Sequence, residues 1–230
     1  MIKGIVFDMD GLMFDTERLA AKAWTFAGEQ MGLDITEAMA IKTLGLNKGD
    51  TDRVLSEEVG QAFDSSAARK IRGDYMTSYI ENYGIPVKSG LFELLDYLNS
   101  NHYKITVATS SDREVARYNF DKAGISKFFN EIVCGDMIER GKPEPDIYLR
   151  ASEIIGVKPN ECLALEDSPM GILSAYRAGL KPVMIPDLLQ PDEGTSSLLY
   201  AKLPTLFDVI ELLSIQNTET PVKDESPKKF

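Results

Sequence analysis

Five short apolar segments, each followed abruptly by polar residues, limit the folds that this chain can adopt. The first, residues 3–7, is rich in β-branched side chains and runs directly into Asp8. Continuous apolar runs of this length are typical of strands buried on both faces of a parallel sheet. The other segments are residues 104–108, 131–134, 162–165 and 182–185. We therefore expect a parallel sheet built from these segments.

Amphipathic helical stretches separate the later apolar segments. Residues 112–123 begin at a capping acid and end before Gly124, and residues 171–178 end before Gly179. Residues 147–155 follow two prolines, which favour a helix start. Strands that alternate with helices indicate an α/β fold, in which a Rossmann-like parallel sheet is covered by helices.

Residues 16–87 interrupt this alternation, because they contain no convincing strand. Glycine and proline between residues 84 and 90 mark the end of this segment. We interpret residues 16–87 as an α-helical cap domain inserted into a core formed by residues 1–15 and 88–215. The last residues, 216–230, are polar and lack apolar periodicity, which predicts a disordered tail. The runs with helical periodicity in the cap are residues 16–31, 50–59 and 67–83.

The composition disfavours several classes of function. Among 230 residues, 36 Asp and Glu outnumber 25 Lys and Arg, which gives a formal net charge of −11. Nucleic acids and anionic membranes attract basic faces, so we expect neither as a partner. A single histidine disfavours a two-histidine metal site, and carboxylates are therefore expected to carry any acid–base chemistry.

Export and membrane insertion are not indicated either. The first apolar run meets Asp8 too early for a secretory signal, and no run approaches the roughly 18 apolar residues of a membrane span. Cys134 and Cys162 lie far apart, without the spacing of a zinc site or a disulfide framework. We expect a soluble, cytoplasmic protein, with a monomer as the default state.

Two acidic residues separated by one position, Asp8 and Asp10, follow the first predicted strand and precede Gly11. Ligands of parallel α/β sheets bind outside the carboxyl ends of the strands. Two carboxylates at such a place can provide a nucleophile or metal ligand together with an acid–base partner. The alternative is an acidic turn that only caps the strand, and this short motif taken alone favours that alternative.

Polar residues of complementary chemistry follow the other predicted strands. Thr109, Ser110 and Ser111 precede a predicted helix, whose N-terminal N–H groups favour an anion. Lys142 precedes another helix start, held by two prolines, and can neutralise phosphate oxygens or a developing negative charge. The alternatives are that Ser111 only caps a helix and that Lys142 is a surface lysine.

A second acidic pair, Glu166 and Asp167, follows the segment 162–165. Together with Asp8, this pair can form a site for a hard cation, because oxygen ligands suit Mg²⁺. Ser168 can alternatively serve as a helix N-cap. Four polar strand ends in one chain nevertheless argue against a separate structural explanation for each.

These strand ends extend into four longer motifs, which occur in order and at plausible spacing. They resemble the motifs of the haloacid dehalogenase superfamily, and most closely those of its β-phosphoglucomutase-like sugar-phosphate phosphatases, which carry a small helical cap. The resemblance covers the chain except for its C-terminal tail. The motifs are Asp8-Met9-Asp10-Gly11-Leu12, Val107-Ala108-Thr109-Ser110-Ser111, Gly141-Lys142-Pro143-Glu144-Pro145-Asp146-Ile147-Tyr148 and Leu165-Glu166-Asp167-Ser168-Pro169-Met170-Gly171.

The resemblance implies a phosphatase that works through an aspartyl-phosphate. Asp8 is then the nucleophile, while Asp10 protonates the leaving oxygen and later takes a proton from water. Mg²⁺ is then held by the Asp8 carboxylate, the Asp10 backbone carbonyl and Asp167. Glu166 is expected beside the metal or in the shell around its ligands.

The resemblance also implies a substrate, a small phosphorylated metabolite of the sugar-phosphate class. Thr109, the Ser110 amide and Lys142 are expected to bind the phosphoryl oxygens. Lys48 ends a loop, residues 45–48, that matches the loop which family caps present to the substrate, so it is expected to contact a sugar or a second phosphate. A solvated lysine is an equal alternative there.

Two other functions stay open. A β-phosphoglucomutase-type phosphomutase carries a histidine in the first cap helix, where Ala20 stands here, and the lone His102 is expected on the surface. This difference favours a phosphatase. A non-enzymatic, phospho-accepting switch module of the receiver type also uses an aspartate, a hydroxyl and a lysine, but it lacks the helical insertion. Asp10 argues against the dehalogenase and phosphonatase branches.

Overall fold

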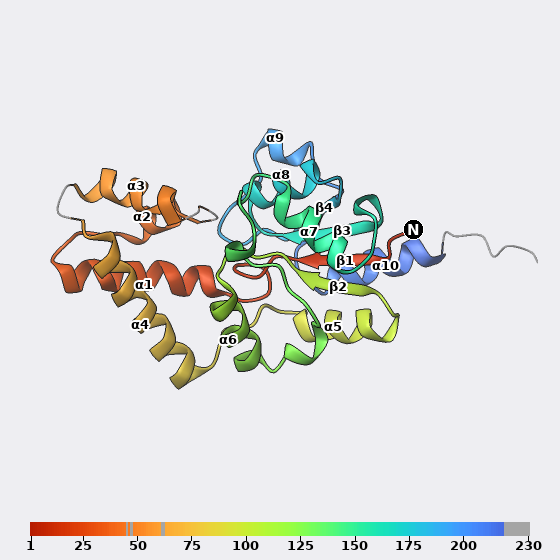
Figure 1. The fold of residues 1–230 in the computed structure, drawn as a ribbon, viewed down its shortest axis with the longest axis horizontal. Helices are drawn as coiled ribbons and strands as arrows, with labels where there is room; N and C mark the ends of the chain where they lie inside the picture. The colour runs from red at the N-terminus through yellow and green to blue at the C-terminus, as the bar shows by residue number, and fades with distance from the viewer. Residues whose placement is uncertain (45, 47, 61–62, 219–230) are drawn as a thin grey trace, which may run out of the picture.

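The computed structural model describes residues 1–44, 46, 48–60 and 63–218. A five-stranded sheet with the order β2-β1-β3-β4-β5 forms the centre of the molecule, and all of its neighbouring strands are parallel (Figure 1). This architecture confirms the predicted α/β fold class. The strands are β1 (Gly4–Phe7), β2 (Lys104–Val107), β3 (Cys162–Glu166), β4 (Lys181–Met184) and β5 (Ala201–Lys202).

The sheet departs from the sequence prediction at its two edges. Residues 131–134 form no strand, because only Val133 pairs with the chain beyond β2, in an isolated parallel bridge to Ala108. At the other edge, the structure adds a strand that was not predicted, β5, which has only two residues. Its two residues form no apolar run that the sequence could reveal. Pairing with β4, rather than the character of its own side chains, makes this short edge segment a strand.

Helices cover both faces of the sheet, which explains why every residue of β1 is buried. Ile5 and Phe7 pack in one apolar cluster with α5, α6 and α10, whereas Val6 packs in a second cluster with α7 and α8. The long helices that cover the two faces are α5 (Leu91–Ser100), α6 (Arg113–Ala123), α7 (Asp146–Ile154), α8 (Pro169–Arg177) and α10 (Asp208–Thr218). Shorter ones are η1 (Ser126–Phe128), η2 (Gly135–Met137), η3 (Pro159–Glu161) and α9 (Glu193–Ser196).

Four helices between β1 and α5 form a separate body on one side of the sheet (Figure 1). Trp24, Leu55 and Ala68 belong to its own apolar cluster. The short helix α2 was not predicted, because five residues carry too little periodicity to be recognised. The four helices are α1 (Thr16–Met31), α2 (Glu37–Ile41), α3 (Lys48–Val59) and α4 (Ser65–Tyr83).

The chain enters and leaves these four helices at adjacent points. Asp15 N–H donates to the carbonyl of Pro86 at 2.8 Å, and Lys88 N–H donates to the carbonyl of Met13 at 3.0 Å. These bonds pair the two connections side by side, next to the carboxyl end of β1. The helices are thereby held over the strand ends at which the polar motifs lie.

The C-terminal boundary differs from the prediction. Helix α10 continues to Thr218 and so includes the first residues of the segment predicted as a tail, whereas residues 219–230 lie outside the described part of the chain. Within the described residues, none of the helices combines the length and the apolar character needed to span a membrane.

Candidate active site

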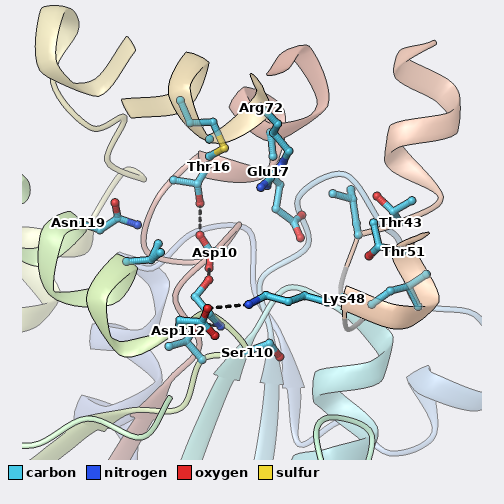
Figure 2. A pocket seen from close by; sticks show the side chains of 18 of the residues that line it. Asp10, Thr16, Glu17, Thr43, Lys48, Thr51, Arg72, Ser110, Asp112 and Asn119 are labelled. Carbon is cyan, nitrogen blue, oxygen red and sulfur yellow. Dashed lines mark hydrogen bonds and ion pairs between the residues drawn. The ribbon is translucent and has the colours of Figure 1, made fainter. Parts of the chain in front are cut away.

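A cavity of about 630 Å³ lies between the carboxyl ends of the central strands and the helices α1–α4. Its core wall contains residues that follow β1, β2 and β3, together with Lys142 from the loop before α7. Its cap wall contains residues of α1, α3 and α4, of which several are labelled in Figure 2. The four sequence motifs therefore converge on one cavity, as the common orientation of parallel strands requires.

The Lys142 ammonium lies at the centre of a buried network. Its Nζ donates to Asp8 Oδ1 at 2.5 Å, to Glu166 Oε1 at 2.7 Å and to the Ala108 carbonyl at 3.1 Å. Tyr148 Oη on α7 donates to the same Glu166 oxygen at 2.7 Å. An ammonium has three donor hydrogens, and all of them are used here. Lys142 is therefore fixed beside Asp8, and the alternative of a surface lysine is wrong, since its side chain is only 5% exposed.

Local packing explains how Lys142 reaches this position. The Ser174 hydroxyl donates to the Glu144 carbonyl at 2.6 Å, and Arg177 donates to the Pro143 carbonyl at 3.1 Å. Both bonds come from α8, so the loop around Lys142 is attached to the helix that follows β3. The loop thus places the ammonium next to the residues at the end of that strand.

For Asp8 and for Lys142, burial and the opposite charge of the ion-pair partner act on the pKa in opposite directions. Burial raises the pKa of Asp8 to about 8, although the ammonium of Lys142 acts to lower it. Burial by itself lowers the pKa of Lys142, but the carboxylates of Asp8 and Glu166 outweigh this effect and raise it. Lys142 therefore remains a cation, and its short contact to Asp8 favours the ionised carboxylate there.

Three buried carboxyl groups, those of Asp8, Glu166 and Asp167, each bring an oxygen within 4.8 Å of the others. Burial, followed by the charge of Glu17, raises the pKa of Asp167 well above its usual range. Burial disfavours the charged form of Asp167, and the neighbouring carboxylates add repulsion to this effect. An oxygen-only, acidic donor set of this kind fits a divalent cation such as Mg²⁺.

Two glycines permit the close packing of these carboxyl groups. Gly11 has φ +86°, and a Cβ on it would lie 2.2 Å from Asp167 Oδ2. A Cβ on Gly171, in the first turn of α8, would lie 1.7 Å from Glu166 Oε1. Glycine is therefore the residue that the motifs need at both positions, because any side chain would displace a carboxylate of the network.

Asp10 is held separately from the lysine network. The hydroxyl of Thr16 donates to Asp10 Oδ1 at 2.6 Å, and the hydroxyl of Ser111 donates to Oδ2 at 2.7 Å (Figure 2). Its carboxylate is thus oriented into the cavity from two sides. Ser111 does not cap a helix as the alternative interpretation held, because Asp112 occupies the N-cap position of α6. Ser168 does cap α8, by accepting from Gly171 N–H at 3.1 Å.

The residues predicted to bind phosphoryl oxygens lie on the same core wall. Thr109 is buried and Ser110 is exposed, and both line the cavity just before the N-terminus of α6. The Thr109 hydroxyl accepts from Ser111 N–H at 3.1 Å, which fixes the turn between β2 and the helix. The structure therefore brings Thr109, Ser110 and Lys142 to one end of the cavity.

Lys48 reaches from the start of α3 to the core, where its Nζ lies 2.7 Å from Asp112 Oδ2 (Figure 2). The two side chains are 71% and 45% exposed. This ion pair lies at the wall of the cavity and joins the two bodies of the molecule. Gly45 and Asn47, from the loop that carried the prediction, lie outside the described residues.

The sequence analysis missed two charged residues of the cavity wall, Glu17 and Arg72. Burial, followed by the charges of Asp8 and Asp10, raises the pKa of Glu17 to about 8. Both Glu17 Oε2 and Arg72 Nε are buried without a hydrogen-bond partner among the described residues. The only available signal for Glu17 was its position one residue after Thr16, in the first turn of α1. Arg72 carries no recognisable motif.

Comparison with known proteins assigns the chain to a family. The family model of the haloacid dehalogenase-like hydrolases matches residues 5–185. The chain is 30% identical over 183 residues to hexitol phosphatase A of Escherichia coli, covering 80% of this chain and 82% of that protein. It is 29% identical over 182 residues to the phosphorylated carbohydrates phosphatase of Thermotoga maritima, covering 79% and 84%.

A third relative is much longer. Protein SUPPRESSOR OF QUENCHING 1, chloroplastic, of Arabidopsis thaliana is 30% identical over 190 residues, which are 80% of this chain but only 18% of that protein. Among solved structures, β-phosphoglucomutase of Clostridium difficile superposes with a TM-score of 0.78 at 23% identity, covering 95% of this chain and 98% of that one. This likeness shows a shared fold.

The chain thus belongs to the haloacid dehalogenase-like hydrolases. Within this family it is a phosphoric monoester hydrolase, as its phosphatase relatives indicate.

Proposed function

We propose that this protein is a Mg²⁺-dependent phosphatase that hydrolyses a small phosphorylated metabolite, a sugar phosphate, through an aspartyl-phosphate. One observation carries the proposal. The Asp8 carboxylate lies at the end of β1 against a buried lysine, and the carboxylate of Asp10, two residues on, is oriented into the same cavity by two hydroxyl groups.

The two aspartates divide the chemistry between them. Asp8 attacks the phosphorus atom and accepts the phosphoryl group, while Asp10 donates a proton to the leaving oxygen of the sugar. Asp10 then takes a proton from the water that attacks the phosphorus of the aspartyl-phosphate, which restores Asp8 and releases inorganic phosphate. The bonds from Thr16 and Ser111 hold Asp10 in place for both proton transfers.

The remaining groups at this end of the cavity balance the charge of the phosphoryl group. Thr109, the Ser110 amide and the Lys142 ammonium would contact its oxygens, since all three lie on the same wall. Positioning and charge neutralisation of this kind supply most of the catalysis in phosphoryl transfer.

The residues that would hold Mg²⁺ are Asp8, Asp167 and the Asp10 backbone carbonyl. Both oxygens of Glu166 already accept hydrogen bonds, one from Lys142 and Tyr148 and the other from Asp167 N–H and Ser168. We therefore propose that Glu166 does not bind the metal directly but holds the residues around the metal ligands in place. When bound, the cation supplies positive charge next to the phosphoryl oxygens.

Hydrolysis is favoured over a phosphomutase reaction by Ala20, which lines the cavity where the mutases carry an imidazole. An alanine cannot move a proton to or from a sugar hydroxyl. His102 is exposed on the loop before β2 and cannot replace it. The names of the relatives, which act on phosphorylated carbohydrates and hexitol phosphates, support a sugar phosphate as the substrate class.

Phosphate release from a panel of hexose, hexitol and nucleoside phosphates tests this proposal, with Mg²⁺ present or removed by EDTA. We expect sugar phosphates to be hydrolysed, EDTA to abolish turnover and added Mg²⁺ to restore it. The Asp8→Asn variant is the matched control and should fold normally without turnover. The proposal would be contradicted by residual turnover in that variant or by turnover that is insensitive to EDTA. Isomerisation of glucose 1-phosphate faster than release of inorganic phosphate would contradict it as well.

A further inference from the structure

Arg72 occupies an unusual position on the cap wall of the cavity. It lies on α4, and its guanidinium stacks over the Trp24 ring, with Cζ 5.3 Å from the ring centroid. Its Nε is buried and has no hydrogen-bond partner among the described residues. Figure 2 shows Arg72 on the cap side, next to Glu17 and away from Ser110 and Asp112 on the core wall.

The other described cations that line the cavity are all committed to carboxylates. Arg72 differs from them, because the described residues give it neither a hydrogen bond nor an ion pair. Lys142 pairs with Asp8 and Glu166, Lys48 pairs with Asp112, and Arg69 pairs with Asp52 through two nitrogen atoms at 2.6 and 2.9 Å.

A guanidinium in this condition is costly for the folded protein. Leaving a donor of a charged group buried and unsatisfied destabilises the folded protein more than leaving a neutral donor in the same condition. Arg69 adds repulsion, because its Cζ lies over the same ring at 5.6 Å. Burial lowers the pKa of Arg72, and the charge of Asp10 opposes that change, so the side chain stays a cation. An anion in the cavity would remove this cost.

Space for such an anion lies beside Arg72. Gly73 also lines the cavity, and a Cβ added to it would have no atom within 4 Å. Glycine inside a helix is less favourable than alanine, so the open space at Gly73 is kept against the helix propensity. Arg72, Gly73 and Met76 thus form a face of α4 that offers a positive charge next to open volume, at the opposite wall from Lys142.

We propose that Arg72 recognises a second oxyanion of the substrate, a carboxylate or a second phosphate. This inference rests on the proposed phosphatase function, because the phosphoryl group is taken to bind at Asp8. The planar guanidinium matches the paired oxygens of either group. The substrate class is then a phosphorylated sugar acid or a sugar bisphosphate, in preference to a phosphate of a neutral sugar or hexitol.

Matched substrates test the role of Arg72. Glucose 6-phosphate has no second anion, 6-phosphogluconate adds a carboxylate, and glucose 1,6-bisphosphate adds a phosphate. We expect kcat/KM of the wild-type enzyme to be at least about tenfold higher for one of the two compounds with a second anionic group than for glucose 6-phosphate, the scale of one charge-assisted hydrogen bond. Arg72→Gln should remove that preference through KM, and Arg72→Lys should retain part of it.

Lys70→Gln is the matched control, because Lys70 lies on the same helix and pairs with Asp74 in solvent. It should leave the preference unchanged. Turnover of p-nitrophenyl phosphate, which carries no second anion, should fall less in Arg72→Gln than turnover of the preferred compound with a second anionic group. This readout shows whether the variant folds and keeps its chemistry.

The outcomes separate the two proposals. The assignment of Arg72 is overturned if the wild-type enzyme has equal kcat/KM for glucose 6-phosphate and for the two compounds with a second anionic group. An unchanged preference in Arg72→Gln overturns it as well. Absence of all turnover by the wild-type enzyme with Mg²⁺ overturns the phosphatase proposal instead. In that event, calorimetric titration of 6-phosphogluconate into wild type and Arg72→Gln still decides the role of Arg72, because equal affinities contradict it and a weaker affinity of the variant supports it.

Discussion

The two walls of the cavity differ in how their charges are held. On the core wall, Lys142 is 5% exposed and all of its donor hydrogens have acceptors. On the cap wall, Lys48 is 71% exposed in a single ion pair, and Arg72 has no partner among the described residues. Core charges are therefore fixed by several neighbours, whereas on the cap wall the Arg72 guanidinium remains available to a ligand.

This difference follows from the elements that carry the residues. Asp8 and Glu166 lie at the ends of adjacent parallel strands whose register is set by backbone hydrogen bonds. Lys48 lies on α3 and Arg72 on α4, a helix that also packs Ile80 into the apolar cluster below the sheet. A rigid wall suits the transfer of the phosphoryl group, and a wall of separate helices suits the choice of substrate.

The largest effect is expected for Asp10→Asn on the core wall. Loss of the acid–base group should lower turnover of sugar phosphates by roughly 10²–10⁴-fold, whatever the second group of the substrate. With p-nitrophenyl phosphate, whose leaving group needs no proton, the variant should accumulate phosphoenzyme that intact-protein mass spectrometry detects. Asp74→Asn, an exposed carboxylate on α4, should behave as wild type. Unchanged turnover of sugar phosphates by Asp10→Asn would contradict the assignment of the chemistry to the core wall.

Stability should distinguish the two lysines. Lys142→Met leaves Asp8 and Glu166 buried without their cation, so the free energy of unfolding should fall by about 3–5 kcal/mol in EDTA. Lys48→Met removes an exposed ion pair and should cost less than about 1 kcal/mol. Urea unfolding of both variants and of wild type measures the difference. Equal losses would show that the core network contributes no more than a surface contact.

The smallest effect is expected at Gly73 on the cap wall. Gly73→Ala should raise the free energy of unfolding by about 0.5–1 kcal/mol, because alanine favours the helix and the added Cβ meets no atom. Urea unfolding again provides the measurement, with an unchanged denaturant slope as evidence of two-state behaviour. Destabilisation would mean that this part of α4 is packed more tightly than the structure indicates.

Much of this arrangement could be predicted from the sequence. The alternation of apolar segments and helices predicted the parallel sheet, and four of the five strand positions were confirmed, at β1, β2, β3 and β4. The strand prediction at residues 131–134 was wrong and β5 was not predicted, because the edge of a sheet depends on which segments pair there and not only on local composition. The N-cap interpretation failed at Ser111 for a related reason, since its hydroxyl bonds a residue far away in sequence.

By itself, the sequence determined which residues stand at the carboxyl ends of the strands, because a buried strand must stop where charged side chains begin. Asp8, Asp10 and Asp167 were found in this way, whereas Lys142 was found from its place before a helix start. Parallel pairing brings such strand ends together whatever the details of packing. Only the tertiary structure decided the surroundings of Glu17 and Arg72. Each lies on an ordinary amphipathic helix, and the direction in which a helix side chain points is set by the packing of α1 and α4 over the sheet.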